Sequence, residues 1–309
     1  VEMYRLENVD GDPVKWDAVL DVRNIRRDMS ITGNISIDPE TAPRQLPVIA
    51  PGEVRRIRIP IAEPDDVRNV GKFTGIMNFS TGDNCEFVQS VDTIFAPYTK
   101  NPPKVDGNPD EWSHGPATMR ADTKDQMKML MTGETWKGTD DLSMLIDMRY
   151  DLENVYVMFE ITDDVFYQPY QMTEYWRGDS VQLAFGFDIN SMNGTCFNVA
   201  LDPDGNTYSY RTAQEDNMGG FQGAGAKGQY TDGQQAVKRI GNKTYYEISI
   251  PWHKMSAGPV KVEKGDEFYF SAIINDNDGT GRKGYMEYAS GVGSGGVRIS
   301  SFYKLYLGK

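Results

Sequence analysis

The stretch from Trp176 to Asp188 carries the residue types best suited to hold a small polar ligand. Apolar side chains at every second position from Val181 to Phe187 predict a strand with one buried and one exposed face. The exposed face carries Gln182 between small residues, and Trp176 lies just before the strand. An indole ring can cover the C–H face of a sugar while amides and carboxylates bind its hydroxyls. The stretch therefore favours sugar binding, and a core strand preceded by a structural tryptophan is the alternative.

Two later alternating runs extend the same polar surface. Asn198 lies between apolar neighbours in one run, and Asn275 ends another. In both runs the alternation turns the amide away from the apolar side chains. An amide both donates and accepts hydrogen bonds, as the recognition of hydroxyls requires. Gln182, Asn198 and Asn275 therefore predict a shallow, amide-rich groove, although a solvated face of an antiparallel sheet shows the same pattern.

Further residues could extend this groove. Tyr175 precedes Trp176 and could enlarge the aromatic platform. Arg211 and Arg282 could bind sugar hydroxyls, although ion pairing at the surface is the simpler interpretation of both.

Two turns collect the oxygen ligands that Ca²⁺ prefers. Asp202 and Asp204 lie in one turn, and Asp276 and Asp278 lie in the other. Neither turn is a complete EF-hand loop, and turns rich in Asp, Asn and Gly also occur without a metal. The sequence leaves calcium and plain turns as open alternatives.

Short strands joined by turns must carry all these residues. The chain has 309 residues, which predicts two domains, and its 31 glycines and 17 tyrosines are typical of all-β proteins. Three prolines between Pro97 and Pro103 predict a stiff junction, and hence domains over 1–100 and 101–309. The first domain is expected to be a β-sandwich. Its Pro51-Gly52-Glu53 turn resembles those of immunoglobulin-like accessory domains.

The charge of the chain excludes several classes of partner. A net charge of −13 repels nucleic acids and anionic membranes and favours neutral or cationic partners. No apolar run approaches the roughly 20 residues that span a bilayer. We therefore expect no insertion into a membrane. The two histidines, His114 and His253, lie in no nucleophile motif.

Five motifs of the second domain resemble family-nine carbohydrate-binding modules. Residues 104–112 resemble the opening I-D-G-x-x-D-E-x-W of that family, and the other matches follow in family order over residues 155–164, 176–188, 246–252 and 274–278. The resemblance implies a jelly-roll-like β-sandwich and bound structural calcium. It also implies a sugar held between two tryptophans, the first of which falls on Trp176. The second is missing between Tyr288 and Gly296, so Tyr288 could replace it, and we expect an open, one-sided platform.

The resemblance also predicts the biological setting. It implies a non-catalytic module that binds a neutral polysaccharide or oligosaccharide, in a secreted or cell-surface bacterial protein whose catalytic domain lies elsewhere. No redox cofactor is expected. Two alternatives remain: a glycan-active enzyme domain, which needs two carboxylates about 5–9 Å apart, and a haem-binding electron-transfer domain, because some members of the wider superfamily bind haem.

Overall fold

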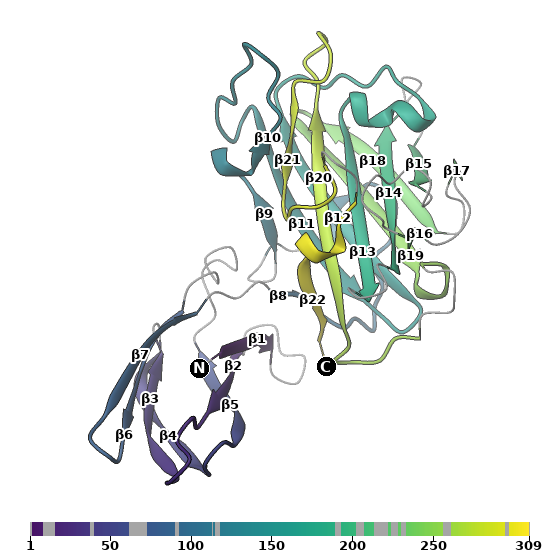
Figure 1. Cartoon of the computed structure of the whole chain (residues 1–309). Coiled ribbons are helices and arrows are strands. Elements are labelled where there is room, and N and C mark those ends of the chain that lie inside the picture. The colour runs from purple at the N-terminus through teal and green to yellow at the C-terminus, as the bar shows by residue number, and fades with distance from the viewer. Residues whose placement is uncertain are drawn as a thin grey trace. The chain divides into compact units, whose positions relative to one another are not determined.

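The computed structural model describes residues 2–8, 16–37, 40–61, 73–89, 93–112, 114, 118–188, 193–201, 207–212, 222–223, 228–229, 233–255, 261–293 and 297–308. The chain divides into two compact units, Val1–Phe95 with Gly308–Lys309, and Ala96–Leu307. Both are built from strands, which confirms the predicted all-β class (Figure 1). Within the described ranges, no helix is long and apolar enough to cross a membrane.

The first unit contains two antiparallel sheets. One has the order β1-β2-β5 and the other the order β4-β3-β6-β7. The elements are β1 (Glu2–Asn8), β2 (Trp16–Arg23), β3 (Ile31–Ile37), β4 (Glu40–Ile49), β5 (Val54–Ile61), β6 (Phe73–Phe79) and β7 (Asn84–Gln89), followed by β8 (Thr93–Ala96). Leu20, Ile35 and Ile59 are buried from both sheets, so the alternating runs of the sequence form the core.

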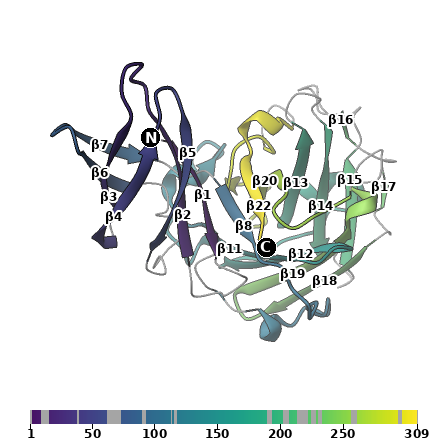
Figure 2. The ribbon, with the colours of Figure 1, turned by 90° about the horizontal axis from the view of Figure 1, so that it is seen from below.

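The second unit is a sandwich of two sheets, which face each other in Figure 2. The first sheet has the order β10-β21-β20-β13-β14-β15-β17, with β22 beside β20 and β16 beside β14. Its strands are β10 (Met127–Lys128), β13 (Ser180–Asp188), β14 (Asn193–Leu201), β15 (Thr207–Thr212), β16 (Gln222–Gly223), β17 (Gly228–Gln229), β20 (Glu267–Asp276), β21 (Gly284–Glu287) and β22 (Tyr303–Leu307).

The second sheet of this unit has the order β18-β19-β12-β11-β9. Its strands are β9 (Met119–Ala121), β11 (Leu142–Tyr150), β12 (Asn154–Asp163), β18 (Gln234–Ile240) and β19 (Lys243–Pro251). Short 3₁₀ helices connect the strands, and one of them, η4 (Met172–Arg177), carries Trp176 into β13.

The core of the sandwich holds the apolar rows that the alternation predicts. Val181, Leu183 and Phe185 of β13 are fully buried. The Phe185 ring lies 5.1 Å from that of Phe270 on β20, and Trp252 packs on Phe268 at 5.5 Å between ring centroids. The predicted inward face of both strands is therefore confirmed, and Trp252 belongs to the same core.

A buried carboxylate explains the opening motif of the second unit. Glu247 of β19 accepts hydrogen bonds from the backbone N–H of Asp106 (2.8 Å) and Gly107 (2.6 Å) and from Nε1 of Trp112 (2.8 Å). Gly107 has φ +77°, a conformation that favours glycine. The Asp-Gly pair and Trp112 are thus structural, because together they satisfy a carboxylate that has no exposed surface.

The predicted junction is bound to the second unit at its start. The N–H of Tyr150 donates to the carbonyl of Pro97, and the N–H of Thr99 donates to the carbonyl of Tyr150. The rings of Tyr98 and Tyr150 meet edge to face at 5.5 Å. The unit boundary, between Phe95 and Ala96, precedes the proline segment, so Pro97 to Thr99 belong to the second unit rather than to a free linker.

His114 links two strands of the second sheet through ionic hydrogen bonds. Its Nδ1 lies 2.7 Å from Asp147 on β11, and its Nε2 lies 3.0 Å from Glu160 on β12. Thr118 also donates to Asp147, and Lys243 of β19 pairs with Glu160. The hydrogen bond with Asp147 is the main cause that raises the pKa of His114 above 6.5, against the opposing effect of burial.

We expect a His114→Gln variant to lose stability in acid only. Because the folded pKa is raised, protonated His114 stabilises the fold below pH 6.5, and this contribution is lost as the pH rises through the folded pKa. The loss should be on the order of 1 kcal/mol, given the partial exposure of the ring. Urea unfolding at pH 5.5 and pH 8.5 measures it. An equal loss at both pH values would show that packing, rather than charge, is responsible.

Candidate functional site

Trp176 lies on a short helix that several buried hydrogen bonds hold in place. Its side chain is 40% exposed, although tryptophan is usually well buried. Gln168 donates to the carbonyls of Tyr175 and Asp179 and lies where any side chain at Gly178 would be, so glycine is required there. The indole is therefore presented by a fixed backbone rather than by a free loop.

A second loop is tied to this helix by Asn277. Its backbone N–H donates to Asp179 at 2.8 Å, and its Nδ2 donates to the carbonyl of Arg177 at 2.6 Å. Its Oδ1 accepts from the N–H groups of Gly279 and Gly281, which shapes the turn between β20 and β21. Asn277 thus brings that turn beside Trp176.

The turn places Arg282 against two aromatic rings. Cζ of its guanidinium lies 5.2 Å from the centroid of Trp176 and 4.8 Å from that of Tyr285 on β21, within the range of cation–π attraction. Burial lowers the pKa of Arg282 to about 10, which keeps the side chain charged at neutral pH. We call Trp176, Arg282 and Tyr285 the aromatic site.

A buried chain of hydrogen bonds orients Arg282. Its Nη2 donates to Oδ1 of Asn275 at 2.5 Å, and Nδ2 of Asn275 donates to the hydroxyl of Ser180 at 3.1 Å. That hydroxyl donates to the carbonyl of Tyr175 at 2.8 Å. Asn275 is completely buried, so the prediction that it contacts a ligand directly is wrong. Its place in the chain makes it a positioning residue for Arg282.

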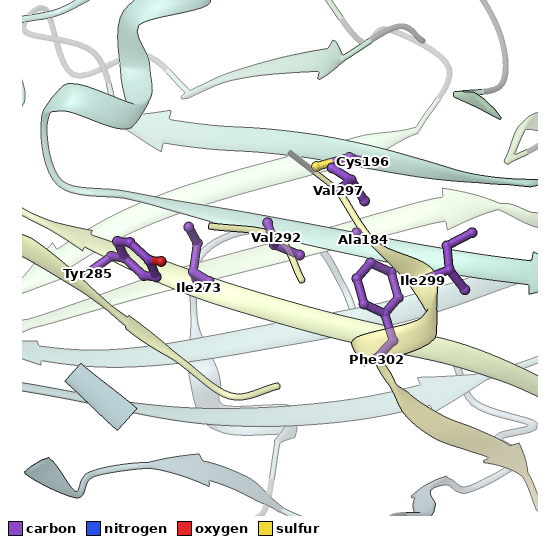
Figure 3. Packing of buried hydrophobic residues seen from close by; sticks show 8 residues of the cluster. All are labelled: Ala184, Cys196, Ile273, Tyr285, Val292, Val297, Ile299 and Phe302. Carbon is purple, nitrogen blue, oxygen red and sulfur yellow. The ribbon is translucent and has the colours of Figure 1, made fainter. Parts of the chain in front are cut away.

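The predicted open groove along β13 and β20 is also wrong. Residues from the ranges 289–293 and 297–302 cover this face, and an apolar cluster fills the space that the alternation left open (Figure 3). Ala184, Ser271 and Ile273 have no exposed surface, and Ile299 lies where a side chain at Gly186 would be. Gln182 stays half-buried. The cluster comprises Ala184, Cys196, Ile273, Tyr285, Val292, Val297, Ile299 and Phe302.

Other predicted ligand-binding residues lie elsewhere. Tyr175 is only 1% exposed and packs on Ala200, so it cannot enlarge the platform. Tyr288 packs edge to face on Tyr303. Its backbone N–H donates to the carbonyl of Ala272. Ala272 faces the opposite side of the sheet from Asn275, so Tyr288 lies on that opposite side too. The side chains of Asn198 and Arg211, and all of Asp202 and Asp204, lie outside the described residues.

Tyr285 is the second aromatic residue beside Arg282, and sequence reasoning missed it. It lies opposite Asn275 in the pairing of β20 with β21. The sequence signal that could have revealed Tyr285 is the short run Gly284–Glu287, which forms β21. Four residues are too few to distinguish a strand from a turn.

The expected metal residues Asp276 and Asp278 belong to a larger acidic cluster. Oxygens of Asp163, Asp276 and Asp278 lie within 4.8 Å of one another, and Asp141, Asp164 and Asp278 form a second such group. Nζ of the buried Lys283 lies 2.8 Å from Asp141, 3.0 Å from Asp278 and 3.4 Å from Asp276. One ammonium thus faces three carboxylates.

The acidic cluster has more carboxyl groups than cations among the described residues. Burial raises the pKa of Asp276 to about 7 and that of Asp163 to about 6. Neither oxygen of Asp276 has a hydrogen-bond partner among the described residues, although the carboxylate is fully buried. A hard divalent cation binds such oxygens, so Asp163, Asp276 and Asp278 fit Ca²⁺ in the chemistry of their donors.

Comparisons with known proteins place this geometry in context. Residues 105–295 match the sequence model described as Carbohydrate family 9 binding domain-like. Two similar solved structures are carbohydrate-binding modules of family 9 from Caldicellulosiruptor kristjanssonii. One, in complex with glucose, is 15% identical and covers 70% of this chain and 96% of its own, with a TM-score of 0.48. The other, in complex with cellotriose, is 14% identical and covers 70% and 93%, with a TM-score of 0.49. No curated protein matches the chain.

Proposed function

The chain belongs to the Carbohydrate family 9 binding domain-like family, and we propose that its sugar-binding site is the aromatic site of Trp176, Arg282 and Tyr285. The observation that carries this proposal is the exposed indole of Trp176, held by a backbone that buried hydrogen bonds fix. A rigid indole loses little conformational entropy when a sugar ring stacks on it.

The ligand of this site is a polysaccharide or oligosaccharide with a mostly neutral backbone. The net charge of −13 disfavours densely anionic chains at long range. Only one ring of the site is open, because Tyr285 is 4% exposed whereas Trp176 is 40% exposed. A one-sided platform does not enclose a chain end, so internal segments of a glycan should bind as well as ends.

Affinity electrophoresis of the full chain against a panel of soluble polysaccharides tests this proposal. At least one neutral polysaccharide should retard the protein, and titration calorimetry with oligosaccharides of increasing length should then show binding without a requirement for a chain end. If the protein binds none of the glycans on the panel, the proposed function is refuted.

The proposal extends to the setting of the chain. We assign it a non-catalytic role over its whole length, in a secreted or cell-surface bacterial protein whose catalytic domain lies elsewhere in the parent protein. The sequence supports this because it contains no E-x-D-x-x-E strand motif of β-sandwich glycosidases. Both ring nitrogens of His114 face carboxylates, which disfavours the haem alternative for this histidine. Release of dye from a chromogenic glycan would contradict the non-catalytic role.

A structural calcium ion is the second part of the proposal. Asp163, Asp276 and Asp278 would hold it, and the ion would supply positive charge that links the end of β12 to the turn after β20. The buried oxygens of Asp276 that lack hydrogen bonds support this assignment. Lys283 already provides one charge at the same place, so we expect the ion to compete with its ammonium.

A further inference from the structure

Arg282 is a half-buried cation without an anionic partner among the described residues. Arg239, on β18, lies 3.4 Å from a carboxylate oxygen of Asp163, and the neighbouring Lys283 pairs with three carboxylates. No such ion pair is formed by Arg282 in the described part of the chain, although the chain as a whole is strongly acidic. A charge that is partly removed from water is usually paired in proteins, and Nε of this guanidinium is fully buried, so the missing partner requires an explanation.

The hydrogen bonds of Arg282 are also incomplete. A guanidinium has five N–H donors, and within the described ranges this one makes a single hydrogen bond, from Nη2 to Asn275. Its Nε is buried and has no acceptor there. The two aromatic rings stabilise the positive charge through their faces, but they accept no conventional hydrogen bond from it.

The position of Arg282 makes it accessible from the sugar platform. Its guanidinium lies over the ring of Trp176, which is the exposed member of the aromatic site. A ligand that stacks on the indole therefore comes within reach of a preoriented guanidinium. The ligand group that complements a guanidinium best is a planar carboxylate, which can accept two parallel N–H bonds.

We propose that the aromatic site takes a glycan that carries a uronic acid residue, with the sugar carboxylate bound by Arg282. This inference rests on the proposed function and specifies the substrate class of the same site. A largely neutral backbone with scattered uronic acid substituents fits both the negative net charge of the chain and the positive charge of Arg282. A polyuronide would be repelled by the net charge of −13, whereas a single carboxylate feels mainly the charges within the Debye length of about 8 Å.

The nearby carboxylates do not cancel this attraction. The acidic groups of the turn that carries Arg282 face Lys283, which lies between Asp141, Asp276 and Asp278. The residue that accepts a hydrogen bond from the guanidinium is the neutral Asn275. Replacing this amide with a carboxylate would give Arg282 an internal anion of almost the same shape, and thus a direct competitor of the ligand.

The test uses polysaccharides that contain uronic acid, each paired with its carboxyl-reduced form, in which the carboxylate becomes a neutral CH₂OH group. The full wild-type chain should bind at least one acidic form about tenfold more tightly than its reduced partner. High salt should remove most of this preference. Arg282→Gln and Asn275→Asp should each bind both forms equally, at about the affinity of the reduced glycan.

Arg177→Gln is the matched control, because Arg177 follows Trp176 in η4 but pairs with Glu174 and is well exposed. It should keep the preference for the acidic form. Equal or tighter binding of the reduced form in every pair, or tighter binding of a sulfated polysaccharide, would overturn the assignment of a carboxylate while the proposed function stands. Loss of the preference in Arg177→Gln would also overturn it. Failure to bind any glycan, acidic or neutral, would refute both.

Discussion

Replacement of Trp176 by alanine should weaken glycan binding by about 2 kcal/mol or more, which is roughly thirtyfold. The indole is the largest exposed surface of the aromatic site, and its removal also takes away the ring that lies 5.2 Å from the Arg282 guanidinium. Titration calorimetry on a polysaccharide that the wild type binds measures the loss. For a site of about 0.1 mM affinity, binding should fall below detection.

Two control variants separate stacking from general effects. Tyr167→Ala removes a ring that is also 40% exposed but has no contact with Arg282 among the described interactions, and it should bind almost normally. Gln182→Ala should also bind almost normally, because Gln182 is half-buried on the covered face of β13 and lies outside the aromatic site. Circular dichroism should show an unchanged fold in all three variants. A folded Trp176→Ala protein with wild-type affinity would remove the site from this part of the molecule.

A Lys283→Met variant should lose about 3–5 kcal/mol of unfolding free energy, the usual cost of removing one partner from a buried ion pair. The Lys283 side chain is 2% exposed, and its ammonium lies within 3.4 Å of three carboxylates, which would be left facing one another. Thermal unfolding measures the loss. Lys243→Met is the matched control, because the Lys243 side chain is 41% exposed and forms its one ion pair in the described part of the chain with Glu160, so its loss should stay below about 1 kcal/mol.

Calcium should act on the same carboxylates. We expect Ca²⁺ to raise the melting temperature of the wild type and EDTA to lower it, since an ion bound only by the folded state stabilises it by mass action. The increase should be larger in Lys283→Met, where no ammonium competes, and absent in Asp276→Asn. Melting curves of wild type and Lys283→Met that do not respond to Ca²⁺ would contradict a metal at Asp163, Asp276 and Asp278.

Local alternation in the sequence was sufficient to predict the strands that carry the site. A strand has a repeat of two residues, so Val181, Leu183 and Phe185 had to share one face whatever their partners were. The strand expected from Val181 to Phe187 lies within β13, Ser180–Asp188. Glu40–Ile49 was missed as a strand, because its prolines and weak alternation resemble a turn region.

Alternation also predicted correctly that Asn275 lies on the side of β20 away from the phenylalanines, and the structure adds that Gln182 and Asn198 are direct partners in the pairing of β13 with β14. It could not show whether that side faces water. The cover over it comes from residues of the ranges 289–293 and 297–302, more than a hundred positions after Gln182, and these residues have no regular apolar period. Whether a polar face binds a ligand or lies under a loop depends on such distant contacts.

The chemical groups of the site were therefore visible in the sequence, but their grouping was not. Trp176 was recognisable because its motif is local, whereas Tyr285 and Arg282 join it only when the turn after β20 is tied to η4 through Asn277. The acidic cluster likewise brings together carboxylates that lie far apart in the sequence, such as Asp141 and Asp278. Hydrophobic periodicity is a property of residues close together in the chain, and it is enough to determine each strand. Contacts between side chains from different turns form only when the whole domain has folded. The folded domain also removes the charged groups of the site from water, which the sequence pattern of a single strand cannot show.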